Sequence, residues 1–296
     1  MDAEIKVTVA SLKSTLNDTE GNLSRVERAC RLAHREGARM CFLPELMLTG
    51  HGAHRKMAEN AQHVPDGPLT EAVIEWSRRW DLCICVGIAE RTKDQIVYNS
   101  QIVVDRGTYI GLQRKINLSG DEYVYFGAGE RVEVFDIGEL RFGITICYDN
   151  HFPELALIHS LQKVDLILAP HAARSGDWPD PLTEEFKQKK IADRQRTWEQ
   201  CHSTRADDHN VYVLLNNAVG PATEGLENVV ANHAGTVMGI DPHGEVFLRT
   251  SATDIIDECV TVELRRNRFR FNHSPTRNRR LSNVVRQMEG VLNSRR

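Results

Sequence analysis

The sequence predicts an α/β protein built as a four-layer α-β-β-α sandwich, with two sheets face to face and helices on both outer faces. Three observations predict it. Strand and helix patterns alternate in both halves of the 296-residue chain, β-hairpin signals lie between and after these halves, and no Pro/Gly/Ser-rich linker separates them. We therefore expect a single domain over residues 1–264, followed by a basic C-terminal extension at 265–296.

In the first half of the chain, segments with the hydrophobic periodicity of strands alternate with segments that have the periodicity of helices. Ile5, Val7 and Val9 are apolar at every second position, as in a half-buried strand. Apolar residues then recur at helical spacing as far as Gly37, a typical helix stop. The remaining elements of this half are a short buried strand at 41–43, a helix over 69–80 with a proline in its first turn, and an apolar strand over 82–89.

A hairpin links the two halves. Strands at 96–104 and 108–113 flank Asp105-Arg106-Gly107, which is a typical hairpin turn sequence. The charged, Gly-rich stretch 115–131 is predicted to be a long loop, and loops of this length are often functional. The second half should contain strands at 132–137, 141–146, 164–168, 211–215, 234–240, 245–249 and 259–264, with helices over 153–161 and 182–208.

Composition excludes several classes of protein. Hydrophobic residues at 41% and charged residues at 26% match globular averages, which excludes collagen-like, disordered and disulfide-scaffold proteins. No apolar run reaches the roughly 18 residues of a membrane helix, and the N-terminus lacks a secretory signal pattern. Seven cysteines without a CxxC pair favour reduced thiols over a zinc site or a redox dithiol. These features predict a cytoplasmic protein that does not bind membranes.

The C-terminal extension carries a charge opposite to that of the rest of the chain. Residues 265–296 contain ten arginines and a single acid, Glu289, whereas the remainder holds 27 basic and 40 acidic residues. A basic tail can bind nucleic acid, but apolar and aromatic residues interrupt these arginines. We therefore expect the extension to pack on the acidic body or on a second subunit, with nucleic-acid binding as the less favoured alternative.

Three chemically capable residues each follow a predicted strand. Cys147 lies between an apolar strand and a helix, at a sharp turn that would expose its sulfur where a helix N-terminus favours the thiolate. Glu45 follows the strand at 41–43, and Lys115 follows the hairpin. Sites in α/β sheets lie at the carboxyl ends of strands, which would bring Glu45 and Cys147 together. Taken singly, each residue has a plain alternative: a buried cysteine, a solvated acid and a solvated lysine.

Glu, Lys and Cys in this chain order resemble the nitrilase superfamily of carbon–nitrogen hydrolases. The resemblance covers nearly the whole chain, and several separated motifs in the correct order are far more specific than any one alone. The segments that carry it are Leu43-Pro-Glu45, Arg114-Lys115, Cys147-Tyr-Asp, Phe152-Pro-Glu154 and Gly239-Ile-Asp-Pro-His-Gly244.

This resemblance implies a thiol hydrolase. Glu45 would act as the general base toward Cys147, and the sulfur would attack an amide or nitrile carbon. Lys115 and the backbone N–H of Tyr148 would stabilise the developing negative charge. Ammonia or an amine would leave a thioester behind, and Glu45 would then activate the water that releases the acid.

The resemblance also implies a second glutamate. Glu122 lies seven positions after Lys115 and would position the substrate or orient the lysine. Asp121 and Glu130 belong to the same predicted loop, and an ordinary loop acid is the alternative interpretation of Glu122.

The substrate pocket of the family follows the strand that corresponds to 164–168. Tyr148-Asp149 looks more like the amidase and carbamoyl-amide branches than the Trp-Glu of nitrile-cleaving members. Arg174 would pair with a substrate carboxylate or form a structural salt bridge, whereas Asp149, Asp177 or Asp180 would instead select a cationic substrate. The residues expected to bind substrate are Tyr148, Asp149, His171, Ala172 and Arg174.

We therefore expect a hydrolase of small linear amides or N-carbamoyl amines that uses no cofactor and, as the resemblance implies, forms a homodimer or a higher homo-oligomer. A nitrilase is the alternative with the same chemistry. A catalytically silent regulator or a nucleic-acid-binding protein is the alternative of another class. His51, His54 and His63 lack a companion cluster of ligands, so we expect no catalytic metal.

Overall fold

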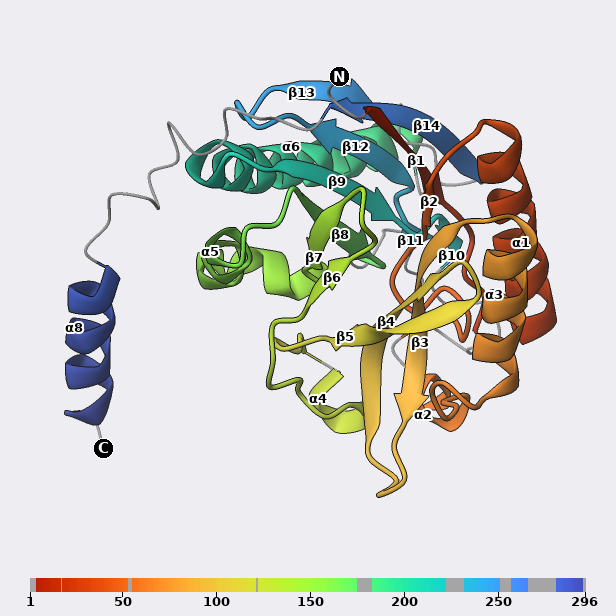
Figure 1. The fold of residues 1–296 in the computed structure, drawn as a ribbon, viewed down its shortest axis with the longest axis horizontal. Coiled ribbons are helices and arrows are strands. Elements are labelled where there is room, and N and C mark those ends of the chain that lie inside the picture. Colours follow the sequence, from red (N-terminus) through yellow and green to blue (C-terminus); the bar gives the residue numbers. More distant parts are fainter. Residues whose placement is uncertain are drawn as a thin grey trace.

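The computed structural model describes residues 4–16, 18–52, 55–120, 122–174, 183–221, 232–250, 257–265 and 281–294. Two six-stranded sheets form the centre of the molecule, and helices lie outside both of them (Figure 1). This arrangement confirms the expected α/β sandwich.

The first sheet combines the N-terminal strands with a strand from near the end of the described body. Its order is β14-β1-β2-β3-β4-β5. β1, β2 and β3 run parallel, whereas β14, β4 and β5 join by antiparallel pairing. The strands are β1 (Glu4–Ser11), β2 (Met40–Phe42), β3 (Cys83–Arg91), β4 (Val97–Asp105), β5 (Thr108–Arg114) and β14 (Glu258–Arg265).

The second sheet repeats this mixed pattern. Its order is β13-β12-β9-β8-β7-β6, with β7, β8 and β9 parallel. The strands are β6 (Val134–Asp136), β7 (Arg141–Ile144), β8 (Leu166–His171), β9 (Tyr212–Asn217), β12 (Thr236–Ile240) and β13 (Val246–Arg249), and β10 (Gly220–Pro221) pairs separately with β11 (Asn232–His233).

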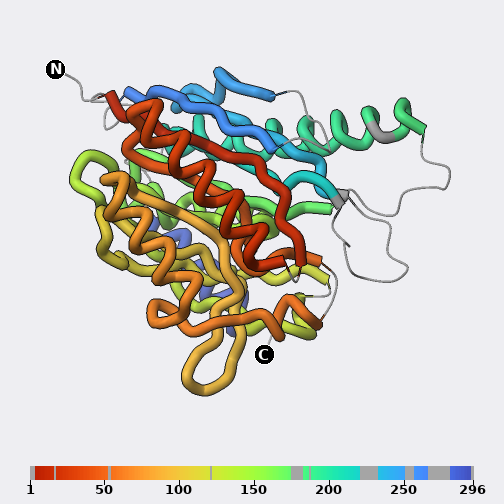
Figure 2. The backbone as a smooth tube through the Cα atoms, turned by 90° about the vertical axis from the view of Figure 1, so that its right-hand side faces the viewer, coloured from red at the N-terminus to blue at the C-terminus, as the bar shows by residue number. Residues whose placement is uncertain are grey.

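Helices complete the outer layers. Figure 2 shows α1, in red, beside α3, in orange, on one outer face, and these two helices are in contact. α5 and α6 contact each other on the side of the second sheet. The helices are α1 (Thr19–Arg35), α2 (Lys56–Glu59), α3 (Pro68–Arg79), α4 (Glu122–Tyr125), α5 (Pro153–Leu161), α6 (Glu184–His209) and α8 (Leu281–Asn293), with a 3-10 helix η1 at Cys147–His151.

The apolar core is divided into layers because successive strand residues point to opposite faces. On β3, Cys83 and Cys85 enter the core between the two sheets, whereas Ile84 and Val86 join the core that α1 and α3 cover. Both faces of this strand are therefore buried, which explains its continuous apolar run.

Most predicted elements match the observed ones to within a few residues. The hairpin is confirmed: Arg106 and Gly107 have φ of 49° and 80°, the two positive values that a type I′ turn requires. The predicted loop at 115–131 also contains the short helix α4, which was not expected. The sequence analysis missed α2, β10 and β11 as well, because each is too short to show a period.

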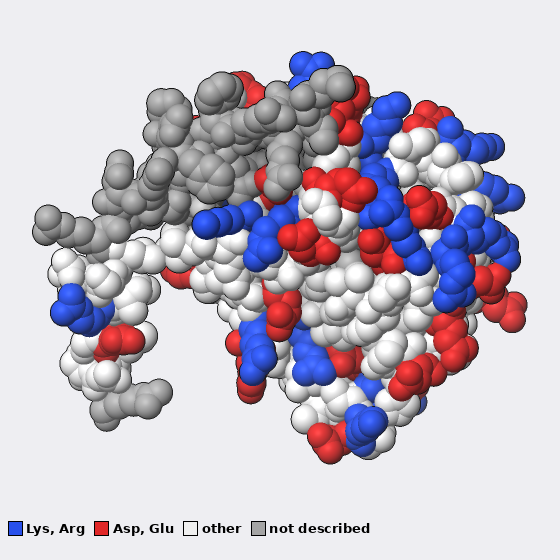
Figure 3. Space-filling model, viewed as in Figure 1, with Lys and Arg blue, Asp and Glu red and all other residues white. Residues whose placement is uncertain are grey.

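Acidic and basic side chains are interspersed over the described face of the body seen in Figure 3. All seven cysteines are unpaired thiols. Among the described helices, none combines the length and apolar character needed to cross a bilayer.

Candidate active site

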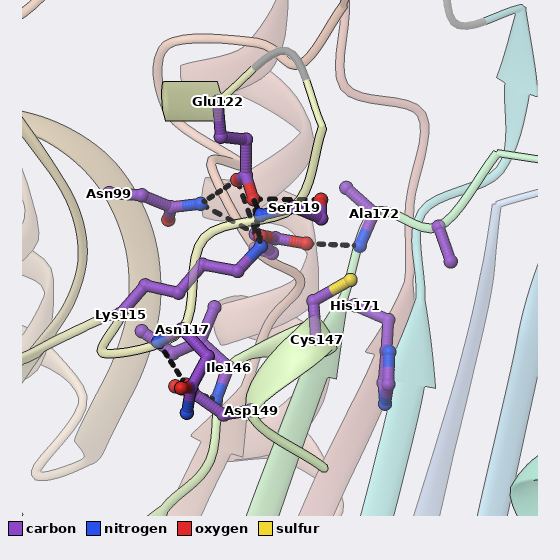
Figure 4. A network of polar contacts seen from close by, with 12 residues as sticks. Asn99, Lys115, Asn117, Ser119, Glu122, Ile146, Cys147, Asp149, His171 and Ala172 are labelled. Carbon is purple, nitrogen blue, oxygen red and sulfur yellow. Dashed lines mark hydrogen bonds and ion pairs between the residues drawn. The ribbon is translucent and has the colours of Figure 1, made fainter. Parts of the chain in front are cut away.

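The three residues expected to carry the chemistry come together from both sheets. Glu45 follows β2 and Lys115 follows β5 in the first sheet, while Cys147 follows β7 in the second. Lys115 and Glu122 lie close to Cys147 in Figure 4, and the cysteine sulfur points toward the Ala172 side of the network.

The carboxylate of Glu45 is fully buried and held by three donors. Its Oε1 accepts hydrogen bonds from Lys115 Nζ and from Asn99 Nδ2, both at 2.8 Å. Its Oε2 accepts a bond of 2.7 Å from the backbone N–H of Ala172. A buried carboxylate needs such donors to replace water, and here they also fix the direction of its lone pairs.

Lys115 links the two glutamates. Its Nζ lies 2.8 Å from the carboxylates of both Glu45 and Glu122, and its side chain is 1% exposed. Burial alone would lower the pKa of Lys115, but the charges of Glu45, Cys147 and Glu122 outweigh burial and raise it. The lysine is therefore an ammonium ion beside Cys147.

Glu122 belongs to the same buried network. Its Oε2 accepts hydrogen bonds from Ser119 N at 2.9 Å and Ser119 Oγ at 3.0 Å, and its Oε1 accepts one of 3.0 Å from Asn99 Nδ2. Of the three acids considered for this role, Glu122 contacts Lys115, Glu130 lines a separate surface pocket, and Asp121 lies outside the described residues.

Cys147 occupies a sharp turn. Its φ of 49° is left-handed, which is rare for a residue with a side chain and marks a constrained backbone. The residue is partly exposed. Burial of the sulfur and the charge of Glu45 raise the pKa of the thiol, and Lys115 only partly offsets them. Desolvation and the two carboxylates therefore oppose the thiolate that the helix N-terminus was expected to favour.

Asp149 fixes this turn to the loop after Lys115. Its carboxylate is 1% exposed and accepts hydrogen bonds from Asn117 N at 2.7 Å, Asn117 Nδ2 at 3.0 Å and Ile146 N at 3.2 Å. Burial raises its pKa to about 6 despite these donors. The contacts indicate that Asp149 positions the backbone, and its contact with substrate stays a prediction.

The other residues expected to bind substrate lie in different surroundings. Tyr148 is 38% exposed and packs against His151 and Phe152, with ring centroids 5.0 and 5.5 Å away. The ring of His171 points away from the Lys115–Glu122 network (Figure 4) and contacts Trp198 and His202.

Ala172 and Arg174 follow β8. Ala172 contributes its backbone N–H to Glu45, and the backbone of Arg174 pairs with His233 as an isolated bridge. Substrate contacts of both residues remain predictions. Asp177 and Asp180, considered for a cationic substrate, lie outside the described residues.

A group of potential metal ligands occurs within the site. Glu45, His51 and Glu122 offer ligand atoms within 4.8 Å of one another. However, the Lys115 ammonium contacts both carboxylates at 2.8 Å and already serves as their shared counter-ion. A metal ion would have to displace this buried cation, so these residues fit a proton-transfer site better than a metal site.

Sequence reasoning missed Asn99, whose Nδ2 bridges the two glutamates. A signal was present: Asn99, Ser100 and Gln101 are three consecutive polar residues within a strand that is otherwise apolar and buried. A buried polar residue in a central strand requires a partner, and that partner is a candidate functional group.

The chain is similar to known proteins over most of its length. A family model described as Carbon-nitrogen hydrolase matches residues 6–270. A curated protein of Pyrococcus abyssi named Nitrilase is 33% identical over 169 residues, or 56% of this chain and 64% of that protein, so the match spans less than two thirds of its length. The omega-amidase of Homo sapiens is 27% identical over 267 residues, which cover 86% of this chain and 85% of that protein.

A solved structure shares the fold. A mutant of the Nesterenkonia AN1 amidase from the nitrilase superfamily superposes with a TM-score of 0.74 at 17% identity, covering 96% of this chain and 97% of that one. This structure shows the shared fold, and the family match over most of the length shows that the chain belongs to the carbon-nitrogen hydrolase family.

Proposed function

We propose that the protein hydrolyses small linear amides, including N-carbamoyl amines, through a thioester on Cys147. The observation that carries this proposal is the position of one buried ammonium, Lys115, between Glu45 and Glu122 and beside the cysteine. Such a group can stabilise a developing oxyanion, while an adjacent carboxylate moves protons.

Attack on the amide begins from a neutral thiol. Because the pKa of Cys147 is raised, its proton must pass to Glu45 as the sulfur–carbon bond forms. The carbonyl oxygen gains negative charge, which the Lys115 ammonium and the backbone N–H of Tyr148 stabilise. Glu45 then gives the proton to the departing nitrogen, the carbon–nitrogen bond breaks, and ammonia or an amine leaves a thioester.

Hydrolysis of the thioester uses the same base. Glu45 accepts a proton from water as the water oxygen attacks the thioester carbon. The carbon–sulfur bond breaks, the proton returns to Cys147, and the carboxylic acid is released. Glu122 and Asn99 hold Lys115 and Glu45 in place throughout, so that neither group has to reorient during either step.

Support for an amide over a nitrile comes from Tyr148-Asp149, the pair that resembles amidase and carbamoyl-amide branches. One relative is named an omega-amidase and one structural neighbour is an amidase. Because another relative is named Nitrilase, nitriles are the competing substrate class, and the test below includes them.

Intact-protein mass spectrometry of the wild type and Cys147→Ala, with ammonia release measured in parallel, tests the proposal. The panel contains small amides, N-carbamoyl amines and the nitriles that match the amides. We expect an acyl adduct on Cys147 with an amide or a carbamoyl amine, and no turnover by the variant. Ammonia release that survives in Cys147→Ala would refute the nucleophile. Turnover of nitriles alone would refute the substrate class, and no turnover of any compound would favour the regulatory alternative.

A further inference from the structure

Asn150 follows Cys147 within η1, and its side chain takes no part in the reaction above. Its Nδ2 donates hydrogen bonds to Thr145 O at 2.9 Å and to Cys147 O at 3.0 Å. These two carbonyls come before and after the backbone of Ile146 and Cys147. One side chain therefore spans the turn that presents the cysteine.

The neighbours of Asn150 determine which way its amide is turned. Carbonyl oxygens only accept hydrogen bonds, so the atom that contacts both carbonyls must be the nitrogen. At the other end of the amide, Oδ1 lies 2.6 Å from Thr145 Oγ1, which donates to it. Thr145 is 3% exposed. The amide is therefore held at both ends.

The backbone at Cys147 needs such restraints. Its φ of 49° is left-handed, and a conformation of this kind persists only where the surrounding contacts hold it. Asp149 accepts a hydrogen bond of 3.2 Å from Ile146 N, on the side before the cysteine. Asn150 binds Cys147 O, on the side after it. Two consecutive side chains of η1 thus fix the backbone on both sides of the cysteine.

The bond to Cys147 O also fixes the direction of the next N–H group. Cys147 O and Tyr148 N belong to one peptide unit, which is planar and trans. The C=O and N–H of a trans unit point in opposite directions, so a side chain that anchors the oxygen also sets the direction of the N–H. The proposed mechanism assigns this N–H to the oxyanion, and such a donor acts only at about 3 Å from the oxygen.

We propose that Asn150 is a positioning residue that aims the Tyr148 N–H at the oxyanion by anchoring the carbonyl of the same peptide. This inference rests on the proposed function for the role of that N–H. Asn150 is uncharged, whereas the pKa of the Cys147 thiol follows burial and neighbouring charges. Loss of the Asn150 amide should therefore weaken oxyanion stabilisation without changing the reactivity of the sulfur.

Two probes separate the N–H from the sulfur. Methyl methanethiosulfonate has no carbonyl: the cysteine sulfur attacks its divalent sulfur, a disulfide forms, methanesulfinate leaves, and the thiol proton passes to a base. Propionaldehyde instead adds the thiol across its C=O bond, which places an oxygen where the amide oxygen would gain charge. Only the second reaction calls on the Tyr148 N–H.

Both reactions are measured at Cys147. Mass spectrometry of the tryptic peptide 142–163, in which Cys147 is the only cysteine, gives the rate of thiolation by methyl methanethiosulfonate. The protection that propionaldehyde gives against thiolation yields the dissociation constant of the aldehyde. Turnover is followed with whichever amide the mass-spectrometric panel identifies.

Asn150→Ala should weaken the aldehyde and lower kcat by about 100-fold each, because a displaced oxyanion donor costs about that much. Its thiolation rate should stay within about threefold of the wild type. Cys201→Ala is the matched control: Cys201 Sγ donates to the backbone oxygen of Asn150 at 2.9 Å, and its loss leaves both Nδ2 bonds in place. This control should leave aldehyde affinity, kcat and thiolation rate within about threefold.

If Asn150→Ala fails to fold, Thr145→Val replaces it. This nearly isosteric change removes the hydroxyl that holds Asn150 Oδ1 and leaves the amide free to turn. We expect the aldehyde affinity to fall by about tenfold, the worth of about one hydrogen bond, with an unchanged thiolation rate.

Three results would overturn the role of Asn150: an unchanged aldehyde affinity in the variant, a thiolation rate that falls as much as the aldehyde affinity, or no protection by aldehyde in the wild type. Wild-type turnover separates this result from the proposed function. Amide hydrolysis with an aldehyde affinity that is independent of Asn150 would sustain the hydrolase and refute the positioning role. An aldehyde affinity that depends on Asn150, without turnover of any amide, would do the reverse.

Discussion

Gly87→Ala tests whether the packing of β3 sets the position of Glu45, the proposed base. A Cβ at Gly87 would lie 2.6 Å from Pro44 O and 2.7 Å from Glu45 C, and closer still to Leu46 N. Carbon atoms pack best at about 3.5 Å, so the backbone at Glu45 would have to retreat by roughly 1 Å. Overpacking of this kind costs about 1–3 kcal/mol of folding stability, and a displacement of about 1 Å at a catalytic group can cost about 100-fold in rate.

The assay compares kcat/KM and urea unfolding of Gly87→Ala with those of the wild type, using whichever amide the mass-spectrometric panel identifies. Ile84→Val is the matched control: it lies on the same strand, is fully buried under α1 and α3, and should cost about 1 kcal/mol of stability with little change in rate. We expect the rate of Gly87→Ala to fall about 100-fold while the protein remains folded. A folded variant whose kcat/KM stays within about threefold of the wild type would refute the link between this close contact and the base.

Three further variants test Glu45, its support by Asn99, and the C-terminal tail. Asn99→Leu removes the donor shared by Glu45 and Glu122, so we expect the free energy of unfolding to fall by about 3 kcal/mol in urea, and a loss below about 1 kcal/mol would contradict this. Glu45→Gln should lower kcat/KM by about 100-fold or more because the proposed base is lost. The same variant should lower the pKa of Cys147 in an ultraviolet thiolate titration, because the Glu45 charge raises that pKa; an unchanged or higher pKa would argue against it. Deletion of 274–296 should reduce the mass on sizing or the melting temperature, since α8 exposes Val284, Val285, Met288, Val291 and Leu292; an unchanged dimer with unchanged melting would rule out that role.

The local signals in the sequence predicted the elements well. Hydrophobic periodicity and turn sequences each involve only a few neighbouring positions. The hairpin at Arg106-Gly107 and the long helices could therefore be placed directly from the sequence. The same reasoning placed Glu45, Lys115 and Cys147 after strands. It could not predict the strand order, in which β14 returns to pair with β1, because that pairing joins residues from opposite ends of the body.

The roles of individual polar residues required the assembled structure. Asn99 became visible as part of the site only through its hydrogen bonds to Glu45 and Glu122, and the contact of Asp149 with the loop after Lys115 only through its hydrogen bond from Asn117. The pKa of the Cys147 thiol also depends on the assembled structure, because burial and the charge of Glu45 raise it, whereas a helix N-terminus alone would lower it.

The sequence by itself therefore determined the order of strands and helices and which chemically capable residues end them, since these depend on short-range pattern. The tertiary structure decided which groups meet. Lys115 Nζ reaches Glu45 across 70 residues of chain, and the N–H of Ala172 reaches it across 127. The tertiary structure also decided the protonation of these groups. The pKa of a buried group depends on desolvation and on charges from distant segments, and neither can be inferred from the adjacent residues.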